Sequence, residues 1–196
     1  APAAEQARVR ARYGLDRPYV LYVGTLEPRK NLVRLIRAWH SLWHRGAISH
    51  QLVLVGGRGW QDADIYDTIA RLNCGDSLRL AGYVPTEDLP ALYSAADAFA
   101  FPSLSEGFGL PVIEAMACGT PVLISTAPAL RELAGDAALA VDGWDDRALA
   151  DALEQLLTDD VLRADLRARG LRRAAAFSWD RAARRTLAVY QEAIAS

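Results

Sequence analysis

Short apolar runs alternate with longer amphipathic stretches along this chain, and this alternation limits its possible folds more than any other feature. The runs indicate strands at 19–24, 51–55, 78–80, 98–101, 121–125 and 138–141. Helix signals indicate helices at 31–45, 62–73, 86–95, from Pro111 onward, and at 145–157, 160–177 and 180–195. Strands separated by helices form parallel sheets with right-handed crossovers. The sequence therefore predicts an α/β fold with a Rossmann-like, doubly wound parallel sheet.

Two of these helices begin at residues that commonly cap a helix. We expect Asn31 to cap the first helix. We expect Thr86 to cap the helix that reaches Ala95, with Glu87 and Asp88 in its first turn.

The composition fits one globular domain. The chain has 196 residues, of which 52% are hydrophobic and 23% are charged, so it can bury a sizeable core. Its net charge of −2 gives no general attraction to nucleic acid or to an anionic membrane, and we expect no nucleic-acid partner. No stretch resembles an integral membrane segment or a signal peptide. The two cysteines, Cys74 and Cys118, suit a cytoplasmic location.

The first eighteen residues differ from the rest. Residues 1–18 are charged and helix-prone, and they end in Asp16-Arg17-Pro18. We expect them to form an interdomain connection or an edge outside the domain, and we expect the domain to span 19–196.

The loops that follow the strands should meet at one edge of the sheet. They are 24–31, 56–61, 82–86 and 102–110. In doubly wound sheets, ligands bind at the carboxyl ends of the strands, so these loops predict one binding site.

Two carboxylates flank a helix start in the last of these loops. Residues 106–114 read Glu-Gly-Phe-Gly-Leu-Pro-Val-Ile-Glu. Because proline suits the first position of a helix, Glu106 should lie in the loop and Glu114 about one turn inside the helix. The glycines allow close approach to the backbone, the helix start favours anions, and carboxylates accept hydrogen bonds from hydroxyls. A ligand with phosphates and sugar hydroxyls, such as a nucleotide sugar, matches this pattern. The alternative is a solvated loop acid followed by a helix-capping acid.

The stretch 106–122 resembles the Glu-x7-Glu signature of the retaining, group-1 glycosyltransferases with the GT-B fold. Residues 22–31 (Tyr-Val-Gly-Thr-Leu-Glu-Pro-Arg-Lys-Asn) resemble the first strand and phosphate loop of that family, and 80–85 (Leu-Ala-Gly-Tyr-Val-Pro) resemble its nucleobase loop. The Glu-Pro-Arg-Lys-Asn form is similar to the mannosyltransferase-B-like branch. The resemblance runs from about Tyr19 to the end and covers the C-terminal, donor-binding half of such enzymes.

The resemblance implies a role for each residue that matches a motif. Glu106, Lys30 and Arg29 are the implied catalytic residues: Glu106 lies near the transferred sugar, and the two cations stabilise the diphosphate. Many relatives carry arginine where this chain has Thr25, so Arg29 is expected to supply the second cation. The implied donor-binding residues are Gly24, Thr25, Tyr83, Val84, Gly107, Phe108, Gly109, Leu110 and Glu114. Among them, Glu114 would bind the ribose, and the backbone at Tyr83 and Val84 would read the base.

Two other patterns have ordinary structural explanations. Gly57-Arg58-Gly59 follows a strand, but Asp62 stands where a dinucleotide-binding loop needs its third glycine. We expect a structural turn there or a contact with donor phosphate. His40 and His44 have a spacing that can bind zinc, but they have no third ligand nearby in sequence. We expect no metal site and no cofactor.

The resemblance implies transfer of a hexose, with mannose as the first choice, from a GDP- or UDP-linked donor in polysaccharide biosynthesis. The acceptor sugar or lipid-linked sugar would be bound by an N-terminal domain, at the inner membrane face. The alternatives are a glycogen-synthase-like or sucrose-forming transferase, and a binding module that is inactive without an acceptor domain. Ala183, Leu187, Tyr190 and Ile194 form an apolar stripe, so we expect the last helix to be an interdomain element.

Overall fold

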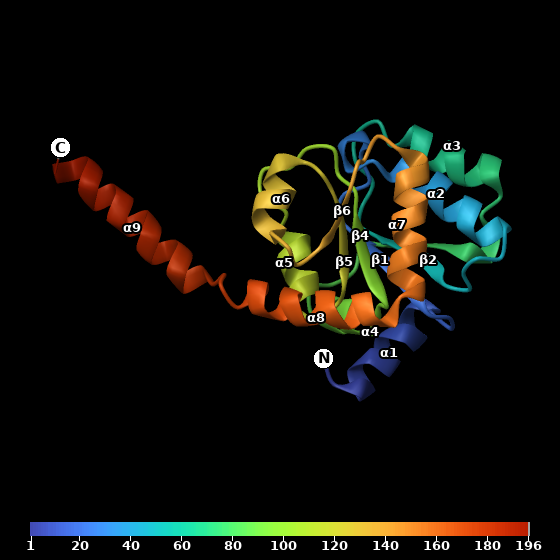
Figure 1. Ribbon diagram of the computed structural model, residues 1–196, viewed down its shortest axis with the longest axis horizontal. Helices are drawn as coiled ribbons and strands as arrows, with labels where there is room; N and C mark the ends of the chain where they lie inside the picture. Colours follow the sequence, from blue (N-terminus) through green and yellow to red (C-terminus); the bar gives the residue numbers. More distant parts are fainter. Residues whose placement is uncertain (196) are drawn as a thin grey trace.

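The computed structural model describes residues 1–195, and it has a central parallel sheet covered by helices on both faces (Figure 1). The sheet has the order β3-β2-β1-β4-β5-β6, and all neighbouring strands are parallel. This is the doubly wound arrangement that the sequence predicts. The strands are β1 (Tyr19–Val23), β2 (Gln51–Val55), β3 (Leu78–Gly82), β4 (Ala98–Phe101), β5 (Val122–Ser125) and β6 (Leu139–Val141).

The helices form two groups around the sheet. One group is α2 (Leu32–His44), α3 (Ala63–Leu72) and α7 (Asp146–Thr158), in which α2 packs against both α3 and α7. The other is α1 (Ala3–Tyr13), α4 (Leu89–Ala95), α5 (Leu110–Ala117), α6 (Pro128–Ala134) and α8 (Asp160–Ala174), in which α5 contacts α4, α6 and α8. Two short 3-10 helices, η1 (Pro28–Lys30) and η2 (Gly75–Ser77), complete this part of the chain.

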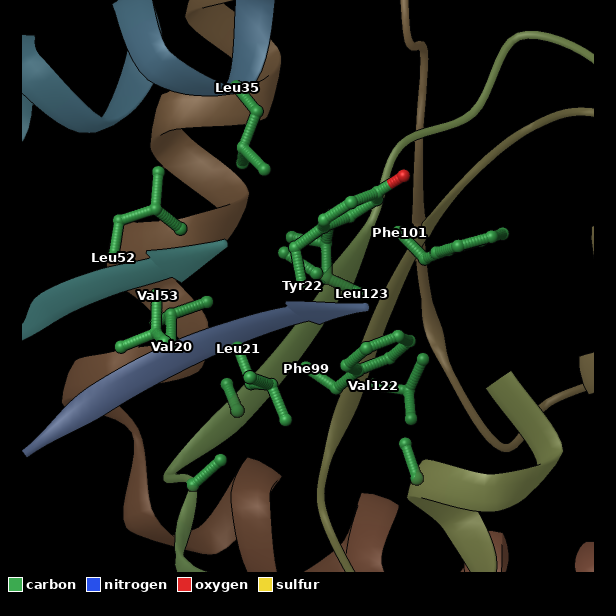
Figure 2. Packing of buried hydrophobic residues seen from close by; sticks show 14 of the residues in the cluster. Val20, Leu21, Tyr22, Leu35, Leu52, Val53, Phe99, Phe101, Val122 and Leu123 are labelled. Carbon is green, nitrogen blue, oxygen red and sulfur yellow. The ribbon is translucent and has the colours of Figure 1, made fainter. Parts of the chain in front are cut away.

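The core lies between the sheet and these helices. Strands β1, β2, β4 and β5 are buried along almost their whole length, because both faces of each strand are covered. Figure 2 shows Tyr22, Phe99 and Phe101 close together among the aliphatic side chains. The α2 side chains that the sequence places on one face, such as Leu35 and Trp39, are fully buried.

Several local expectations are wrong at helix boundaries. The helix expected from Thr86 begins at Leu89, because residues 86–88 form a turn in which the Leu89 amide donates to the Thr86 carbonyl. The helix expected over 160–177 ends at Ala174. Helix α6 is absent from the expected elements, although Pro128 stands at its first turn, where proline is favoured.

The first helix packs on the domain. Val9 of α1 is buried, and α1 lies against α4. The carboxylate of Asp88, which has no exposed surface, accepts hydrogen bonds from Arg8 (2.7 Å), Arg12 (2.8 Å) and Tyr13 (2.6 Å). Asp88 therefore ties α1 to the start of α4. That residues 1–18 also connect to a second domain stays a prediction.

The last helix, α9 (Trp179–Ala195), extends away from the domain as an arm (Figure 1). No residue of α9 up to Ala195 is buried. Leu187, Tyr190 and Ile194 are between 56% and 86% exposed, so the predicted apolar stripe has no cover within residues 1–195.

Candidate donor-binding site

The candidate site lies where the strand order reverses. Strands β1 and β4 are neighbours, and the chain leaves them in opposite directions across the sheet. The loops after these strands, residues 24–31 and 102–109, therefore begin side by side at the carboxyl edge. In open α/β sheets this is the position at which ligands bind.

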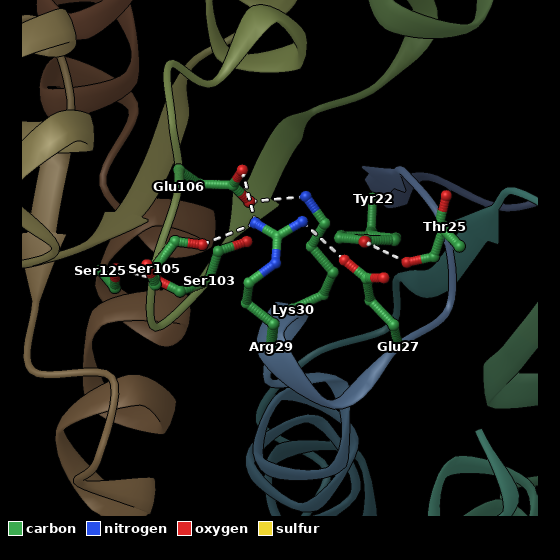
Figure 3. A network of polar contacts seen from close by, with 9 residues as sticks. All are labelled: Tyr22, Thr25, Glu27, Arg29, Lys30, Ser103, Ser105, Glu106 and Ser125. Carbon is green, nitrogen blue, oxygen red and sulfur yellow. Dashed lines mark hydrogen bonds and ion pairs between the residues drawn. The ribbon is translucent and has the colours of Figure 1, made fainter. Parts of the chain in front are cut away.

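Arg29 and Lys30 from the first loop converge on Glu106 from the second (Figure 3). The Lys30 ammonium donates to Oε1 of Glu106 at 2.6 Å, and the Arg29 guanidinium donates to Oε2 at 2.8 Å. The guanidinium also donates to the Ser105 carbonyl (2.7 Å) and to Glu27 (2.6 Å). The structure thus brings together the three residues that the sequence analysis names as catalytic.

The ion pair between Lys30 and Glu106 is largely buried. Their side chains are 10% and 8% exposed. Burial alone would raise the pKa of Glu106, but the hydrogen bonds from Lys30 and Arg29 outweigh it and hold the pKa below its ordinary value. Glu106 is therefore a carboxylate at neutral pH, and it is placed to accept further hydrogen bonds or to face developing positive charge.

Backbone and side-chain hydrogen bonds join the two loops. The Leu104 amide donates to the Arg29 carbonyl at 2.9 Å. The buried Asn31 amide donates to the carbonyls of Pro102 (3.2 Å) and Gly143 (2.7 Å). Asn31 stands at the N-cap position of α2, as expected, but its side chain does not make the expected cap bond. Asn31 has a left-handed backbone (φ 61°), which turns its side chain toward these loops instead.

The loop after β2 packs directly on the loop after β1. Leu26 and Arg58 form a parallel bridge, and the Gly59 amide donates to the Leu26 carbonyl at 3.0 Å. A Cβ at Gly56 would lie 2.0 Å from the Gly24 carbonyl oxygen, so only glycine fits there. The Arg58 guanidinium is held by Asp62. The turn at 57–59 therefore supports the loop at 24–31 structurally.

Glu106 and Glu114 occupy the positions that the spacing predicts. Glu106 lies before α5, and Glu114 is one turn inside α5, exposed, with Oε2 accepting from the Tyr93 hydroxyl at 2.9 Å. Gly109 begins α5 with φ 101°, and a Cβ there would meet Leu130 at 2.7 Å. Gly107 faces open space. Gly107, Phe108 and Leu110 are therefore exposed beside the helix start, whereas Gly109 is buried.

Four more of the predicted donor-binding residues lie in or beside the same two loops. Phe108 and Leu110 are about half exposed, and the Phe108 ring meets Phe177, just after α8, edge-on at 6.1 Å. Gly24 and Thr25 follow β1, where the Tyr22 hydroxyl donates to the Thr25 carbonyl at 3.1 Å.

The proposed base-reading loop lies farther along the edge. Tyr83 and Val84 follow β3, two strands from β1, and the structure does not bring them into the Glu106 cluster. Tyr83 is 78% exposed and the Val84 side chain is buried.

Sequence reasoning missed three residues that shape this site. Glu27 holds Arg29, Asn31 joins the loops, and Tyr93 contacts Glu114. The sequence could have indicated Glu27, because an acid two residues from Arg29 is a plausible ion-pair partner. Nothing in the sequence indicates the contact of Tyr93, because its partner Glu114 is 21 residues away on another helix.

The histidine pair is not part of this site. His40 and His44 stack on each other along α2, with ring centroids 5.6 Å apart. Within residues 1–195, no group of three or more histidine, cysteine or acidic side chains is placed to hold a metal ion. Over the same residues, no helix has the length and apolar character needed to cross a bilayer.

Comparison with known proteins extends the resemblance to most of the chain. Residues 5–173 match the family described as glycosyl transferases group 1. The chain is 43% identical over 173 residues to O-antigen chain mannosyltransferase B from Escherichia coli, covering 88% of this chain and 45% of the relative. It is 41% identical over 202 residues to D-inositol 3-phosphate glycosyltransferase from Salinispora arenicola, covering 97% of this chain and 45% of that relative.

Solved structures agree with the fold. Sucrose-phosphate synthase from Thermosynechococcus elongatus has a TM-score of 0.84 and 35% identity, over 99% of this chain and 49% of that protein. HepE from Anabaena, solved in complex with UDP and glucose, has the same fold with a TM-score of 0.78 and 23% identity. The match covers 90% of this chain and 48% of that protein. This chain spans about half the length of the relatives it matches. The family match and the shared fold together show that the chain belongs to the group 1 glycosyltransferases.

Proposed function

We propose that this chain is the donor-binding half of a retaining hexosyltransferase that uses a nucleotide diphosphate sugar. One observation carries the proposal: Arg29 and Lys30 converge on Glu106 at the carboxyl edge of the sheet, beside the start of α5. Two cations, a carboxylate and free helix amides in one place suit a ligand that combines phosphates with a sugar.

The proposed chemistry assigns the two cations to the leaving group. The bond between the sugar C1 and the diphosphate oxygen breaks, and negative charge develops on that oxygen, where Lys30 and Arg29 stabilise it. The acceptor hydroxyl attacks C1 from the same face, and the departing diphosphate takes its proton. Glu106 positions the sugar and stabilises positive charge on it, and Glu114 binds the ribose. No cofactor or metal enters this scheme.

The composition of the chain supports a special role for Lys30. It is the single lysine of the sequence, whose lysines and arginines number 22. An ammonium is a compact charge with three donors, whereas a guanidinium is a planar fork, so the two are not equivalent at a phosphate. A chain that otherwise uses arginine keeps lysine at the point where the proposed diphosphate binds.

The proposal also covers the identity of the donor sugar and of the acceptor. The 43% identical relative named O-antigen chain mannosyltransferase B favours mannose as the transferred sugar, and we propose GDP as its carrier. The second relative, named D-inositol 3-phosphate glycosyltransferase, favours a different acceptor with the same donor-side chemistry. We propose that the acceptor binds to a further domain, that the enzyme works in the cytoplasm at the inner membrane face, and that this half alone binds donor without transferring it.

Calorimetry with GDP, UDP, GDP-mannose and UDP-glucose tests the proposal. We expect the wild-type chain to bind one base in preference to the other. Lys30→Met should weaken that binding about 10- to 100-fold, because it removes a charge-assisted hydrogen bond. The matched control is Arg45→Met, which removes an exposed cation that pairs with Glu154 outside the site. Absence of nucleotide binding by the wild type, or equal affinity in Lys30→Met, would contradict the proposal.

The single lysine allows a second, independent test. An amine-selective acylating reagent has two targets in this sequence, Lys30 and the amino terminus, so peptide mass mapping reads each reaction separately. A bound nucleotide diphosphate should slow the modification of Lys30 and leave the amino terminus unaffected. Equal rates with and without nucleotide would argue against phosphate binding at Lys30.

A further inference from the structure

A buried tyrosine on α4 contacts the proposed ribose-binding carboxylate. The Tyr93 hydroxyl donates to Oε2 of Glu114 at 2.9 Å, and the Tyr93 side chain is 1% exposed. Glu114 itself is exposed on α5. One oxygen of Glu114 is therefore held from inside the protein, which leaves Oε1 for a ligand.

The position of the Tyr93 hydroxyl is fixed by packing. Its ring meets Phe99 of β4 edge-on, with centroids 5.4 Å apart. The Thr120 hydroxyl donates to the Tyr93 carbonyl at 2.7 Å, which anchors α4 to the end of α5. A buried ring that packs against Phe99, on a helix whose backbone is anchored, gives its hydroxyl little freedom to move.

The same ring begins a row of aromatic side chains that leads to the phosphate loop. Phe99 stacks on Phe101 at 5.8 Å, and Phe101 stacks on Tyr22 at 5.8 Å. The Lys30 ammonium lies 5.0 Å from the Phe101 ring centroid. Tyr93 and Lys30 thus contact the same row of buried aromatic rings. The parts of the site that would bind ribose and phosphate therefore pack on one continuous set of side chains.

The protonation state of Tyr93 suits a permanent donor. Burial raises the pKa of Tyr93, and the nearby Glu114 carboxylate raises it further. The hydroxyl therefore stays protonated across the physiological range and remains a hydrogen-bond donor to Glu114.

We propose that Tyr93 is a positioning residue that fixes the Glu114 carboxylate so that its free oxygen accepts hydrogen bonds from the ribose hydroxyls of the donor. This inference rests on the proposed function and assigns a part of that site. A carboxylate without this bond could rotate about its last torsion, so binding would have to order it.

The test compares nucleotide diphosphates with and without ribose hydroxyls. Tyr93→Phe keeps the ring and removes the donor. Its affinity for the preferred ribonucleoside diphosphate should fall about threefold to tenfold, the range for one hydrogen bond. Its affinity for the 2′,3′-dideoxy analogue should equal that of the wild type, because that ligand makes no use of Glu114.

Tyr19→Phe is the matched control. The Tyr19 hydroxyl is also buried and donates to the Leu92 carbonyl of the same helix at 2.7 Å, but it does not contact Glu114. Tyr19→Phe should leave the affinities for both ligands unchanged at a similar cost in stability. If both tyrosine variants weaken both ligands equally, the effect is structural and the inference is wrong.

The remaining outcomes separate this inference from the proposed function. If the wild type binds no nucleotide, both fail. If Glu114→Ala weakens the ribonucleotide selectively and Tyr93→Phe does not, only the role of Tyr93 fails. If Tyr93→Phe does not fold, 3-fluorotyrosine at position 93 gives the answer. Its fluorine resonance should shift with the ribonucleotide and not with the dideoxy analogue, and equal shifts would overturn the inference.

Discussion

The Lys30 ammonium lies 2.6 Å from Oε1 of Glu106, and the two side chains come from loops that are 76 residues apart in sequence. Arg29 contacts the other oxygen of the same carboxylate at 2.8 Å. Glu106 therefore pairs with both cations of the proposed phosphate site, and Glu27 supplies a second carboxylate to Arg29. A diphosphate that binds there must share these cations with Glu106 or displace it.

This geometry predicts that Glu106→Gln binds the nucleotide diphosphate more tightly than the wild type. The substitution removes a negative charge that competes for Lys30 and Arg29, and an interaction of about 1 kcal/mol corresponds to roughly fivefold in affinity. Calorimetry with the free nucleotide measures the change. Glu132→Gln, at an exposed acid on α6, is the control and should leave affinity unchanged. Weaker binding by Glu106→Gln would show that Glu106 orders the cations and does not compete for them.

The lowered pKa of Glu106 predicts a pH-dependent contribution to stability. The folded-state pKa lies below the ordinary value of 4.5, so the stabilisation is present above that value and is lost as pH falls through the folded-state pKa. The wild type should exceed Glu106→Gln in free energy of unfolding by a constant amount at about pH 6 to 7. Urea titrations at decreasing pH should show the gap closing below 4.5. A gap that stays constant at low pH would contradict the assigned ion pair.

The two hydrogen bonds of Asn31 predict a large effect from a small substitution. Asn31→Asp keeps the shape and the tolerance for a left-handed backbone, but it places an acceptor beside the carbonyls of Pro102 and Gly143. We expect a loss of about 2–4 kcal/mol in the free energy of unfolding, because two buried carbonyls lose their donor. Asn73→Asp is the control, since Asn73 is also left-handed (φ 47°) but exposed, and it should cost less than about 0.5 kcal/mol. Similar losses in both variants would rule out the loop-joining role.

The hydrogen bonds of the Asp88 carboxylate predict that its charge keeps α1 docked on the domain. Hydrogen bonds from Tyr13 and Arg8 lower the pKa of Asp88, so it is charged while α1 is docked. Asp88→Asn keeps the side-chain size and removes the charge, and amide exchange across Ala3–Tyr13 should become faster than in the wild type. Glu5→Gln removes an exposed partner of Arg8 and should leave exchange in α1 unchanged. Unchanged protection in Asp88→Asn would mean that apolar contacts such as Val9 suffice.

The exposed stripe on α9 predicts weak self-association or rapid exchange of this helix. Leu187, Tyr190 and Ile194 present apolar surface that nothing in residues 1–195 covers, and such a surface favours association. Sedimentation should show a concentration-dependent dimer that Leu187→Glu abolishes and Val161→Glu, at an exposed position on α8, does not. If the sample is strictly monomeric, residues 181–194 should exchange rapidly. Core-like protection in a monomer would contradict the exposed position of α9.

The alternation of strands and helices and the order of the motifs were readable from the sequence. Each strand is a short apolar run in the sequence, and each motif loop follows a strand, so the switch-point site at residues 24–31 and 102–109 follows from general topology. The placement of Glu106 before a helix and of Glu114 inside it depends on neighbouring glycines and Pro111, which act over a few residues.

The roles of Asn31, Asp88 and Tyr93 became visible only in the folded structure. As isolated residues, Asn31 suits a helix cap and Asp88 suits a first helical turn. Asn31 does stand at the cap position of α2, but its side chain makes no cap bond, and Asp88 precedes the first turn of α4. Asn31 instead donates to carbonyls 71 and 112 residues away, and Asp88 accepts from α1.

There is a physical reason why the sequence predicts the elements but not the partners of these polar side chains. Hydrophobic periodicity, glycine and proline act within one turn or one strand, so the sequence by itself determined the elements, their order and the edge at which the site lies. A polar side chain chooses its partner after packing has brought distant loops together and excluded water, because a buried donor or acceptor must then be satisfied by whatever lies beside it. Tertiary structure alone therefore decided that Glu106 pairs with Lys30 and Arg29, and that Tyr93 donates to Glu114.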